Sequence, residues 1–226
     1  MKKGIEYADK SWNPFTGCEM TGCQVGKNCW AYKMSKRLAG RYGYYKINPF
    51  QPTFHPYRLG EPQNRKKPTR FNTCFMGDIA YAKKEWLQEI IEVMEECPQH
   101  RFYILTKRPD LLAQKNLFFP ENAWLGVSVN QDTDKWRITD LFNIRCHHRW
   151  VSFEPVYGDI KARLNGIDWV VIGAQSNPSV QPESWWVDSI LKETIRLDIP
   201  VFGKPNLTIV SLVQSLPPEL KEGFNV

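Results

Sequence analysis

Three cysteines near the N-terminus have the residue type and the spacing to hold a metal centre. Cys18, Cys23 and Cys29 lie in the polar, glycine-containing stretch WNPFTGCEMTGCQVGKNCWA, with the spacing C-x4-C-x5-C. Three thiolates in such a loop suit a [4Fe–4S] cluster, which they bind through three of its irons. The fourth iron then stays open to a substrate or cofactor, and an iron with an open position is a reactive site.

Zinc is an alternative occupant of the same loop. A structural zinc ion needs a fourth ligand, and no histidine lies near the three cysteines. His55 is the nearest histidine, and Cys74 is the other candidate. The residue types therefore favour a cluster, while zinc or ordinary loop thiols stay open as interpretations. Cys97 and Cys146 fit buried thiols, because cysteine commonly fills protein cores.

Short apolar runs and helical segments alternate from residue 71 onward, and these elements must position the reactive residues. Such alternation predicts parallel strands joined by right-handed crossovers, in a barrel or in an open doubly wound sheet. A further strand at Ile5–Ala8, before the cysteine loop, brings the expected number to about seven. The other expected strands are Phe71–Met76, Phe102–Leu105, Trp124–Val129, Arg149–Phe153, Trp169–Ile172 and Val201–Phe202.

Three segments have the residue spacing of helices. In residues 83–96 and 184–197, apolar side chains recur every three to four positions, which predicts two amphipathic helices. Ser184 is the expected N-cap of the second helix, and residues 132–142 carry a weaker form of the pattern. Residues 40–70 contain five scattered prolines and predict an irregular, basic lid instead.

Polar side chains follow six consecutive apolar runs. In parallel α/β folds, ligands bind at the carboxyl ends of the strands, so these side chains are expected to share one rim. Lys107, Glu154 and Lys204 are long and functional in type, unlike the residues that turns select. The chain has no G-x-G-x-x-G and no Walker-type loop, so nicotinamide dehydrogenases and P-loop enzymes lose support. The expected rim residues are Asp78, Thr106, Lys107, Arg108, Ser128, Asn130, Glu154, Gln175, Ser176 and Lys204.

Composition favours a single α/β domain over residues 1–226 in a soluble, cytoplasmic protein. No run approaches the roughly 18 apolar residues of a membrane span, so we expect no membrane association. In a reducing compartment, six cysteines are better explained as thiols or metal ligands than as disulfides.

The charge is distributed unevenly along the chain. Residues 1–70 hold 14 Lys and Arg against 4 Asp and Glu, a balance of +10, whereas the other 156 residues hold 16 against 20. A basic N-terminal third favours an anionic partner such as a nucleic acid or a nucleotide, with an ordinary solvated basic face as the alternative. Basic and aromatic residues are interleaved in residues 41–46, which allows phosphate contacts beside base stacking; packing of those aromatics within the lid is the interpretation we favour.

Several short motifs occur in an order that resembles a known superfamily. They are WNPFTGC, KNCWA, LTKRP, WLGVSV, VSFEP and WVVIGAQS, between Trp12 and Ser176, and a looser likeness continues to Lys204. With a three-cysteine loop after the first strand of a β/α chain, they resemble the radical SAM superfamily. They look closer still to an uncharacterised phage- and prophage-encoded branch near it. The usual superfamily spacing is C-x3-C-x2-C, so the middle cysteine of this chain departs from it.

The resemblance implies a fold and a chemistry. The fold is a partial or complete (β/α) barrel with parallel strands, in which the cluster loop with Cys18, Cys23 and Cys29 follows the first strand. S-adenosylmethionine would bind the open iron and be cleaved reductively, giving a 5′-deoxyadenosyl radical that abstracts hydrogen from the substrate. A reductant protein would supply the electron.

Residue roles follow in part from the resemblance and in part from matching of charge. Met76, Gly77 and Asp78 stand where the superfamily has its glycine-rich strand-end element, which implies contact with the methionine amino group, although this chain reads MGD rather than GGE. Gln175 stands where the branch tends to have an acid, and an amide cannot titrate. The other cofactor-binding candidates are Ser128, Asn130 and Gln175, and the catalytic candidates are Lys107, Glu154 and Lys204.

The sequence thus predicts a radical SAM-type iron–sulfur enzyme whose unknown substrate is a nucleic acid or a nucleotide. The competing hypothesis is a non-catalytic, zinc-stabilised nucleic-acid-binding protein. Such a protein has no need for a rim of charged strand ends. The oligomeric state stays open.

Overall fold

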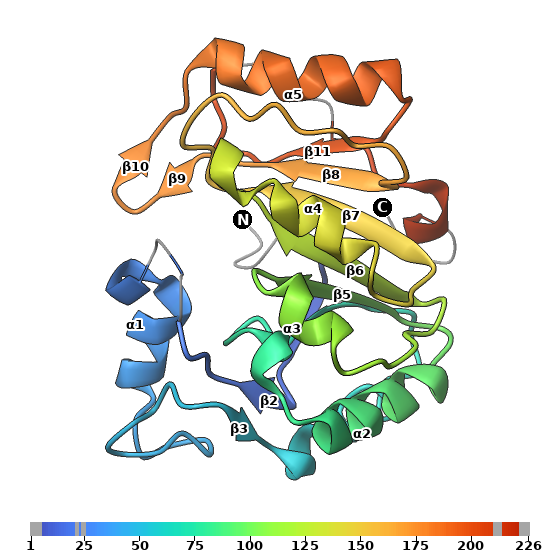
Figure 1. Cartoon of the computed structure of the whole chain (residues 1–226). Helices are drawn as coiled ribbons and strands as arrows, with labels where there is room; N and C mark the ends of the chain where they lie inside the picture. The colour runs from blue at the N-terminus through green and yellow to red at the C-terminus, as the bar shows by residue number, and fades with distance from the viewer. Residues whose placement is uncertain (1–5, 21–22, 24–25, 210–213, 222–226) are drawn as a thin grey trace.

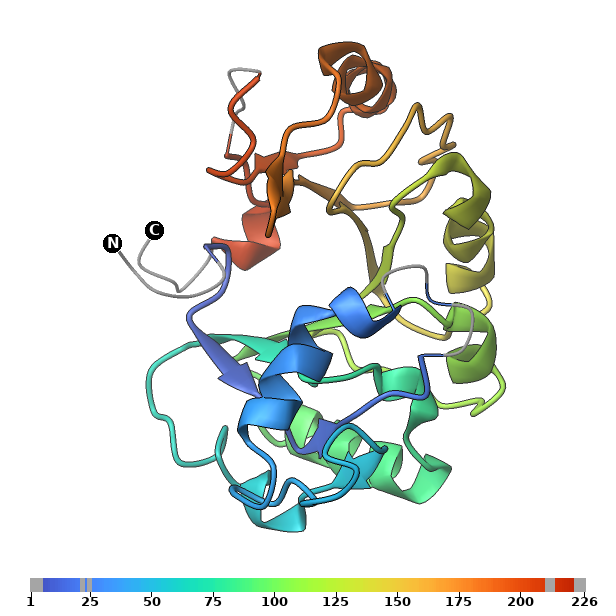
Figure 2. The same cartoon turned by 90° about the vertical axis from the view of Figure 1, so that its left-hand side faces the viewer.

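A curved, all-parallel sheet of seven strands forms the centre of the computed structural model, which describes residues 6–20, 23, 26–209 and 214–221. The strands are hydrogen-bonded in the order β1-β4-β5-β6-β7-β8-β11, with β1 and β11 at the two edges (Figure 1). The sheet is an open half-barrel (Figure 2), which confirms the predicted α/β partial barrel. The strands are β1 (Lys10–Trp12), β4 (Arg70–Thr73), β5 (Arg101–Thr106), β6 (Ala123–Ser128), β7 (His148–Phe153), β8 (Trp169–Ile172) and β11 (Val201–Gly203).

Two small antiparallel pairs lie outside this sheet. β2 (Phe15–Thr16) pairs with β3 (Thr53–Phe54), and β9 (Gln175–Ser176) pairs with β10 (Ser179–Val180). β3 therefore lies in a segment for which the sequence predicted no regular element, together with the 3-10 turn Pro56–Arg58. The apolar pattern missed β3 because the strand is only two residues long.

All but one of the described helices cover the convex face of the half-barrel (Figure 2). The exception, α1, lies apart from them beside the carboxyl ends of the strands, which we call the mouth of the half-barrel. None of the described helices combines the length and the apolar character needed to cross a membrane. The helices are α1 (Trp30–Arg37), α2 (Lys84–Glu95), α3 (Pro109–Ala113), α4 (Trp136–Leu141) and α5 (Ser184–Arg196), and the other 3-10 turns are Gly26–Asn28, Ile79–Tyr81, Asp132–Asp134 and Pro218–Leu220.

Three expectations need correction. The described part of Ile5–Ala8 is not a strand; the first strand is β1, which is recognisable only from its pairing with β4 because Lys10 and Ser11 are exposed. Ser184 is the first residue of α5, and Glu183 is its N-cap. The helix expected at 132–142 is divided into a 3-10 turn and the short helix α4.

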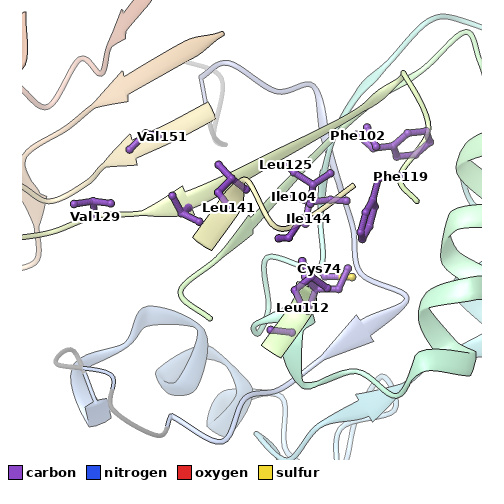
Figure 3. Packing of buried hydrophobic residues seen from close by; sticks show 14 of the residues in the cluster. Cys74, Phe102, Ile104, Leu112, Phe119, Leu125, Val129, Leu141, Ile144 and Val151 are labelled. Atoms are coloured by element: carbon purple, nitrogen blue, oxygen red, sulfur yellow. The ribbon is translucent and has the colours of Figure 1, made fainter. Parts of the chain in front are cut away.

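The main hydrophobic core lies between the convex face and the helices. Figure 3 shows Ile104 and Leu125 from the sheet against Leu112, Leu141 and Ile144 from the helical side. The predicted helices at 83–96 and 184–197 contribute to it as α2 and α5, whose apolar faces are buried against the strands. Alternate strand residues point to opposite faces of a sheet, so a second set of side chains faces the concave side.

Aromatic side chains fill the concave side near the amino ends of the strands. The Tyr7 ring lies 5.3 to 5.9 Å from those of Tyr103, Trp150, Trp169 and Phe202. Edge-to-face contacts of this kind are favourable beyond simple burial. The amino half of the half-barrel is therefore a packed floor.

Candidate functional site

The concave face changes from aromatic to polar toward the carboxyl ends of the strands. Tyr103, Trp124 and Trp150 belong to the aromatic floor. Because side chains alternate with a period of two, residues four positions further along each strand return to the same face, closer to the mouth. Those residues are Lys107, Ser128 and Glu154, three of the predicted site residues.

At the end of β8, the residue at the equivalent position on the concave face is a glycine. Gly173 lies four residues after Trp169, and a Cβ there would be 3.1 Å from both the Cγ of Glu154 and the Cδ of Lys204. The two long side chains therefore cross directly above Gly173. Lys204 follows β11 and donates from Nζ to Oε1 of Glu154, while Glu6 Oε2 lies 3.6 Å away from the same ammonium. The structure thus brings together two catalytic candidates as a partly buried ion pair.

A second network joins the ends of β5 and β6. Lys107 Nζ donates to Asn130 Oδ1 at 2.9 Å, and Asn130 Nδ2 donates to the carbonyl of Pro155 at 2.9 Å. The Asn130 backbone N–H donates to Oδ2 of Asp134 at 3.1 Å. Asn130 is therefore fixed on both sides, and its partner Lys107 is held at the mouth.

Arg137 was missed by the sequence reasoning. It occupies a buried position on α4, pairs with Asp134 at 2.8 Å and donates to the carbonyl of Ser128 at 2.8 Å. Burial lowers the pKa of Arg137, and the carboxylates of Asp134 and Asp78 oppose that shift. A buried, paired cation thus lies at the carboxyl end of β6. The available signal was the i,i+3 spacing of Asp134 and Arg137.

The base of the cysteine loop is joined to the end of β4 through two glycines. A Cβ on Gly77 would lie 2.1 Å from the carbonyl oxygen of Gly17, and Gly17 itself has a φ of +93°. Gly17 N–H donates to the carbonyl of Met76, and the Met76 N–H donates to Oδ1 of Asn13. The predicted cofactor-binding element Met76–Asp78 therefore holds the loop in place through its backbone.

Asp78 is the most highly bonded of the predicted residues. Its carboxylate accepts from Thr106 Oγ1 at 2.6 Å, from Lys107 N–H at 2.8 Å and from Ala80 N–H at 3.1 Å. Burial raises the pKa of Asp78, and these hydrogen bonds oppose the shift. The residue links the ends of β4 and β5 directly beneath the loop.

The three cysteines lie on one side of this support. Burial, followed by the charge of Asp78, raises the pKa of Cys18 to about 12, and Cys23 and Cys29 add smaller increments in the same direction. The three thiols are free and partly buried. They do not form a ready-made centre, because no three His, Cys, Asp or Glu side chains within the described ranges converge as metal ligands.

The donor set nevertheless fits an iron–sulfur cluster better than zinc. The loop brings three free thiols to the mouth, and Cys29 is the N-cap of α1. Cys74, the candidate fourth zinc ligand, is buried in the main core (Figure 3). His55 is buried as well, and its Nε2 lies 2.8 Å from Oγ1 of Thr16.

Gln175 lies apart from the networks described above. It belongs to the β9–β10 hairpin beyond β8, and its Nε2 donates to the carbonyl of Pro178 at 3.0 Å. Ser128 is buried at the end of β6. The structure thus groups the Lys107–Asn130 and Glu154–Lys204 pairs around the mouth and leaves Gln175 engaged within its own hairpin.

Comparison with known proteins gives one family and one structural likeness. The family described as "Protein of unknown function (DUF5131)" matches residues 2–206. Among solved structures, the chain is similar to "Spore photoproduct lyase complexed with dinucleoside spore photoproduct", with a TM-score of 0.50 and 11% identity. The match covers 85% of this chain and 63% of that one, so the chain spans less than two thirds of the neighbour's length. No curated protein matches.

Proposed function

The chain belongs to the DUF5131 family of proteins of unknown function, and we propose that it is a radical SAM-type iron–sulfur enzyme. The observation that carries the proposal is the position of Cys18, Cys23 and Cys29. They belong to one loop that follows β1, and the base of that loop is hydrogen-bonded at Gly17 to the chain just after β4, on the carboxyl side of the parallel half-barrel. That end of the strands is where parallel α/β enzymes bind their ligands.

The structural neighbour supports an enzymatic role. It is a lyase whose match covers 85% of this chain, and its structure holds a dinucleoside spore photoproduct. These are properties of the neighbour, and for this chain they favour catalysis and a substrate that contains nucleotides. The proposed likeness to a phage- and prophage-encoded branch rests on the sequence motifs alone.

In the proposed enzyme, Cys18, Cys23 and Cys29 would hold a [4Fe–4S] cluster, which when bound would supply the electron for reductive cleavage of S-adenosylmethionine. Cys18 must lose its proton to serve as a ligand, and its raised pKa means that metal binding drives that loss. The electron comes from a separate reductant protein.

The polar face has groups suited to S-adenosylmethionine and to the substrate. Asp78, with Met76 and Gly77, supports the loop, and the superfamily resemblance assigns this element to the methionine amino group. Lys107 and Asn130, with Ser128, offer a cation and hydrogen bonds for a carboxylate and a ribose. We assign the Glu154–Lys204 pair to the substrate, because its ammonium and carboxylate can exchange a proton across one hydrogen bond.

The proposal includes a cytoplasmic location, because six free thiols suit a reducing compartment. Its test is purification without oxygen, followed by iron and sulfide analysis and by electron paramagnetic resonance of the reduced protein. We expect a brown protein with about four irons per chain, a signal that changes when S-adenosylmethionine is added, and formation of 5′-deoxyadenosine. Colourless protein with one stoichiometric zinc would refute it in favour of the zinc-stabilised module.

A further inference from the structure

Helix α1 and the segment after it form an exposed surface with a one-sided charge. Between Glu19 and Glu61 the chain has no acidic residue and seven basic ones. Five of them, all exposed, are Lys33, Lys36, Arg37, Arg41 and Lys46. No carboxylate among the described residues forms an ion pair with any of the five. We call the exposed side chains of residues 30–46 together with Tyr57 and Arg58 the α1 surface.

The helix itself presents these groups on one face. Trp30, Lys33 and Arg37 follow the spacing of three and four residues that aligns side chains along a helix. Ala31 and Ser35 are the buried residues of α1 and lie on a different face. The cations and the indole of Trp30 therefore form a solvent-facing stripe.

Four large aromatic side chains are exposed on the same surface. Trp30, Tyr42, Tyr45 and Tyr57 are 56, 71, 53 and 67% exposed. The Tyr57 hydroxyl and the Arg58 guanidinium both donate to the carbonyl of Tyr42, which has a φ of +52°. The tyrosines are thus presented by a fixed loop. The alternative interpretation, in which the aromatics of residues 41–46 pack inside the lid, holds for Tyr44, which is buried, and fails for Tyr42 and Tyr45.

The α1 surface leads to the cysteine loop. Cys29 is the N-cap of α1, and Trp30 follows it directly. An eight-residue helix is about 12 Å long, which is the length of roughly three to four stacked bases at the spacing of a nucleic-acid strand. A strand that binds along α1 would therefore reach the mouth of the half-barrel.

We propose that the α1 surface binds a single-stranded nucleic acid and directs it to the cysteine loop, a proposal that rests on the proposed function for the reaction at that loop. Exposed aromatics between cations are the pattern of single-strand binding, because unpaired bases stack on rings while phosphates contact Lys and Arg. An acidic reductant protein would also be attracted to the exposed lysines and arginines of the α1 surface. It would not account for four exposed rings among the cations, so we argue for the nucleic acid.

The test measures binding of fluorescein-labelled 15-mers by anisotropy, with separate oligo-dT, oligo-U and duplex arms, on metal-free protein. We expect tighter binding of one or both single strands than of duplex. About six phosphate contacts predict a slope of log affinity against log salt of roughly −4. The comparison of oligo-dT with oligo-U then identifies the DNA or RNA class.

Two pairs of variants assign the binding to this surface. The triple change Lys33→Glu, Arg37→Glu and Lys46→Glu should lower affinity roughly 100-fold and reduce the slope by about 2. A control with the same charge change at exposed lysines elsewhere should stay within about threefold; its positions are Lys84, Lys192 and Lys221. Tyr45→Ala should cost about tenfold, and Trp185→Ala, which removes a ring 55% exposed on α5, should cost little.

Cleavage of S-adenosylmethionine without oligonucleotide is measured on the same variants after anaerobic reconstitution with iron and sulfide, which separates the two proposals. We expect the α1 variants to retain cleavage and iron content while losing oligonucleotide binding. If the wild-type protein cleaves S-adenosylmethionine and binds no oligonucleotide, or binds only an acidic reductant protein through these lysines, the inference is wrong and the function stands. If the wild-type protein binds oligonucleotide through this surface and assembles no cluster, the inference stands and the proposed function is wrong. Equal loss in the control triple would also overturn the inference.

Discussion

Adding one methyl group at Gly77 should disconnect the cysteine loop from the sheet. The methyl carbon of Gly77→Ala would lie 2.1 Å from the carbonyl oxygen of Gly17 and 2.4 Å from its nitrogen. Both contacts are to backbone, so no side-chain rotation relieves them. The two segments must move apart. That movement breaks the bonds from Gly17 N–H to Met76 and from Asp78 N–H to Gly17, each 3.0 Å long.

The cost follows from those contacts. Two hydrogen bonds are worth about 1 kcal/mol each, and overpacking typically adds about 1–3 kcal/mol. The total is roughly 3–5 kcal/mol if the loop stays attached. For a chain of 226 residues this corresponds to a fall in Tm of about 10 °C. If the loop detaches instead, Tm falls less and iron binding is lost.

The assay combines thermal unfolding with iron analysis of anaerobically reconstituted protein. Gly158→Ala is the matched control, because a Cβ there has no neighbour within 4 Å. We expect Gly158→Ala to resemble the wild type in both measurements, while Gly77→Ala loses either stability or iron. A Gly77→Ala protein with unchanged Tm and full iron content would refute the steric reasoning, and with it the role of this contact as the base of the loop.

The remaining predictions address the other groups at the site. Lys204→Ala removes the ammonium shared by Glu6 and Glu154, so it should lower the free energy of unfolding by about 1–3 kcal/mol and impair turnover with normal iron content. The control is Lys161→Ala, which breaks a pair with Asp159 in which the lysine is 79% exposed. It should cost under about 0.5 kcal/mol in the same unfolding assay. Cys29→Ala should abolish iron binding with little change in Tm, whereas Cys74→Ser should lower Tm and retain iron, because only Cys74 lies in the core. The pKa of His55 is lowered from 6.5 to about 4, chiefly by burial, so the unfolded state binds the proton first as pH falls. Stability should therefore be complete above pH 6.5 and decline by up to about 3 kcal/mol as pH falls toward 4, at about 1.4 kcal/mol per pH unit. Urea unfolding across this range should show a smaller decline in His55→Gln, and an equal decline would exclude His55 as the cause.

The sequence predicted the strands that are buried on both sides and missed the elements that lack an apolar pattern. Strands β5 to β8 are continuous apolar runs because helices cover one face and the aromatic floor covers the other. β1 is an edge strand with two exposed polar residues, so only pairing with β4 defines it. α1 buries only Ala31 and Ser35, which gives no apolar period to detect.

The site could be predicted to the extent that it depends on strand ends. The rule that ligands meet the carboxyl ends of parallel strands identified Asp78, Lys107, Glu154 and Lys204, which the structure places around one mouth. The partners of these residues were not predictable. Lys107 and Asn130 follow the neighbouring strands β5 and β6, whereas Lys204 after β11 reaches Glu154 after β7 across the end of β8. The strand order that brings each pair together cannot be read from the sequence. Arg137 was missed although Asp134 lies three residues before it, because only the fold brings the carbonyl of Ser128 to its guanidinium.

The division of the concave face into an aromatic floor and a polar mouth has a consequence for how substitutions act. Trp150 lies across β6, where a Cβ on Gly126 would be 2.4 Å from its ring, and its Nε1 donates to the carbonyl of Trp124 at 3.0 Å. These rings are buried against one another, and the polar part of the concave face begins at Glu154, four residues after Trp150. Substitutions in the floor should therefore change stability first, because they open cavities in a packed region. Substitutions at the mouth should change chemistry first, because the side chains there are held by polar contacts with one another and are not part of the core.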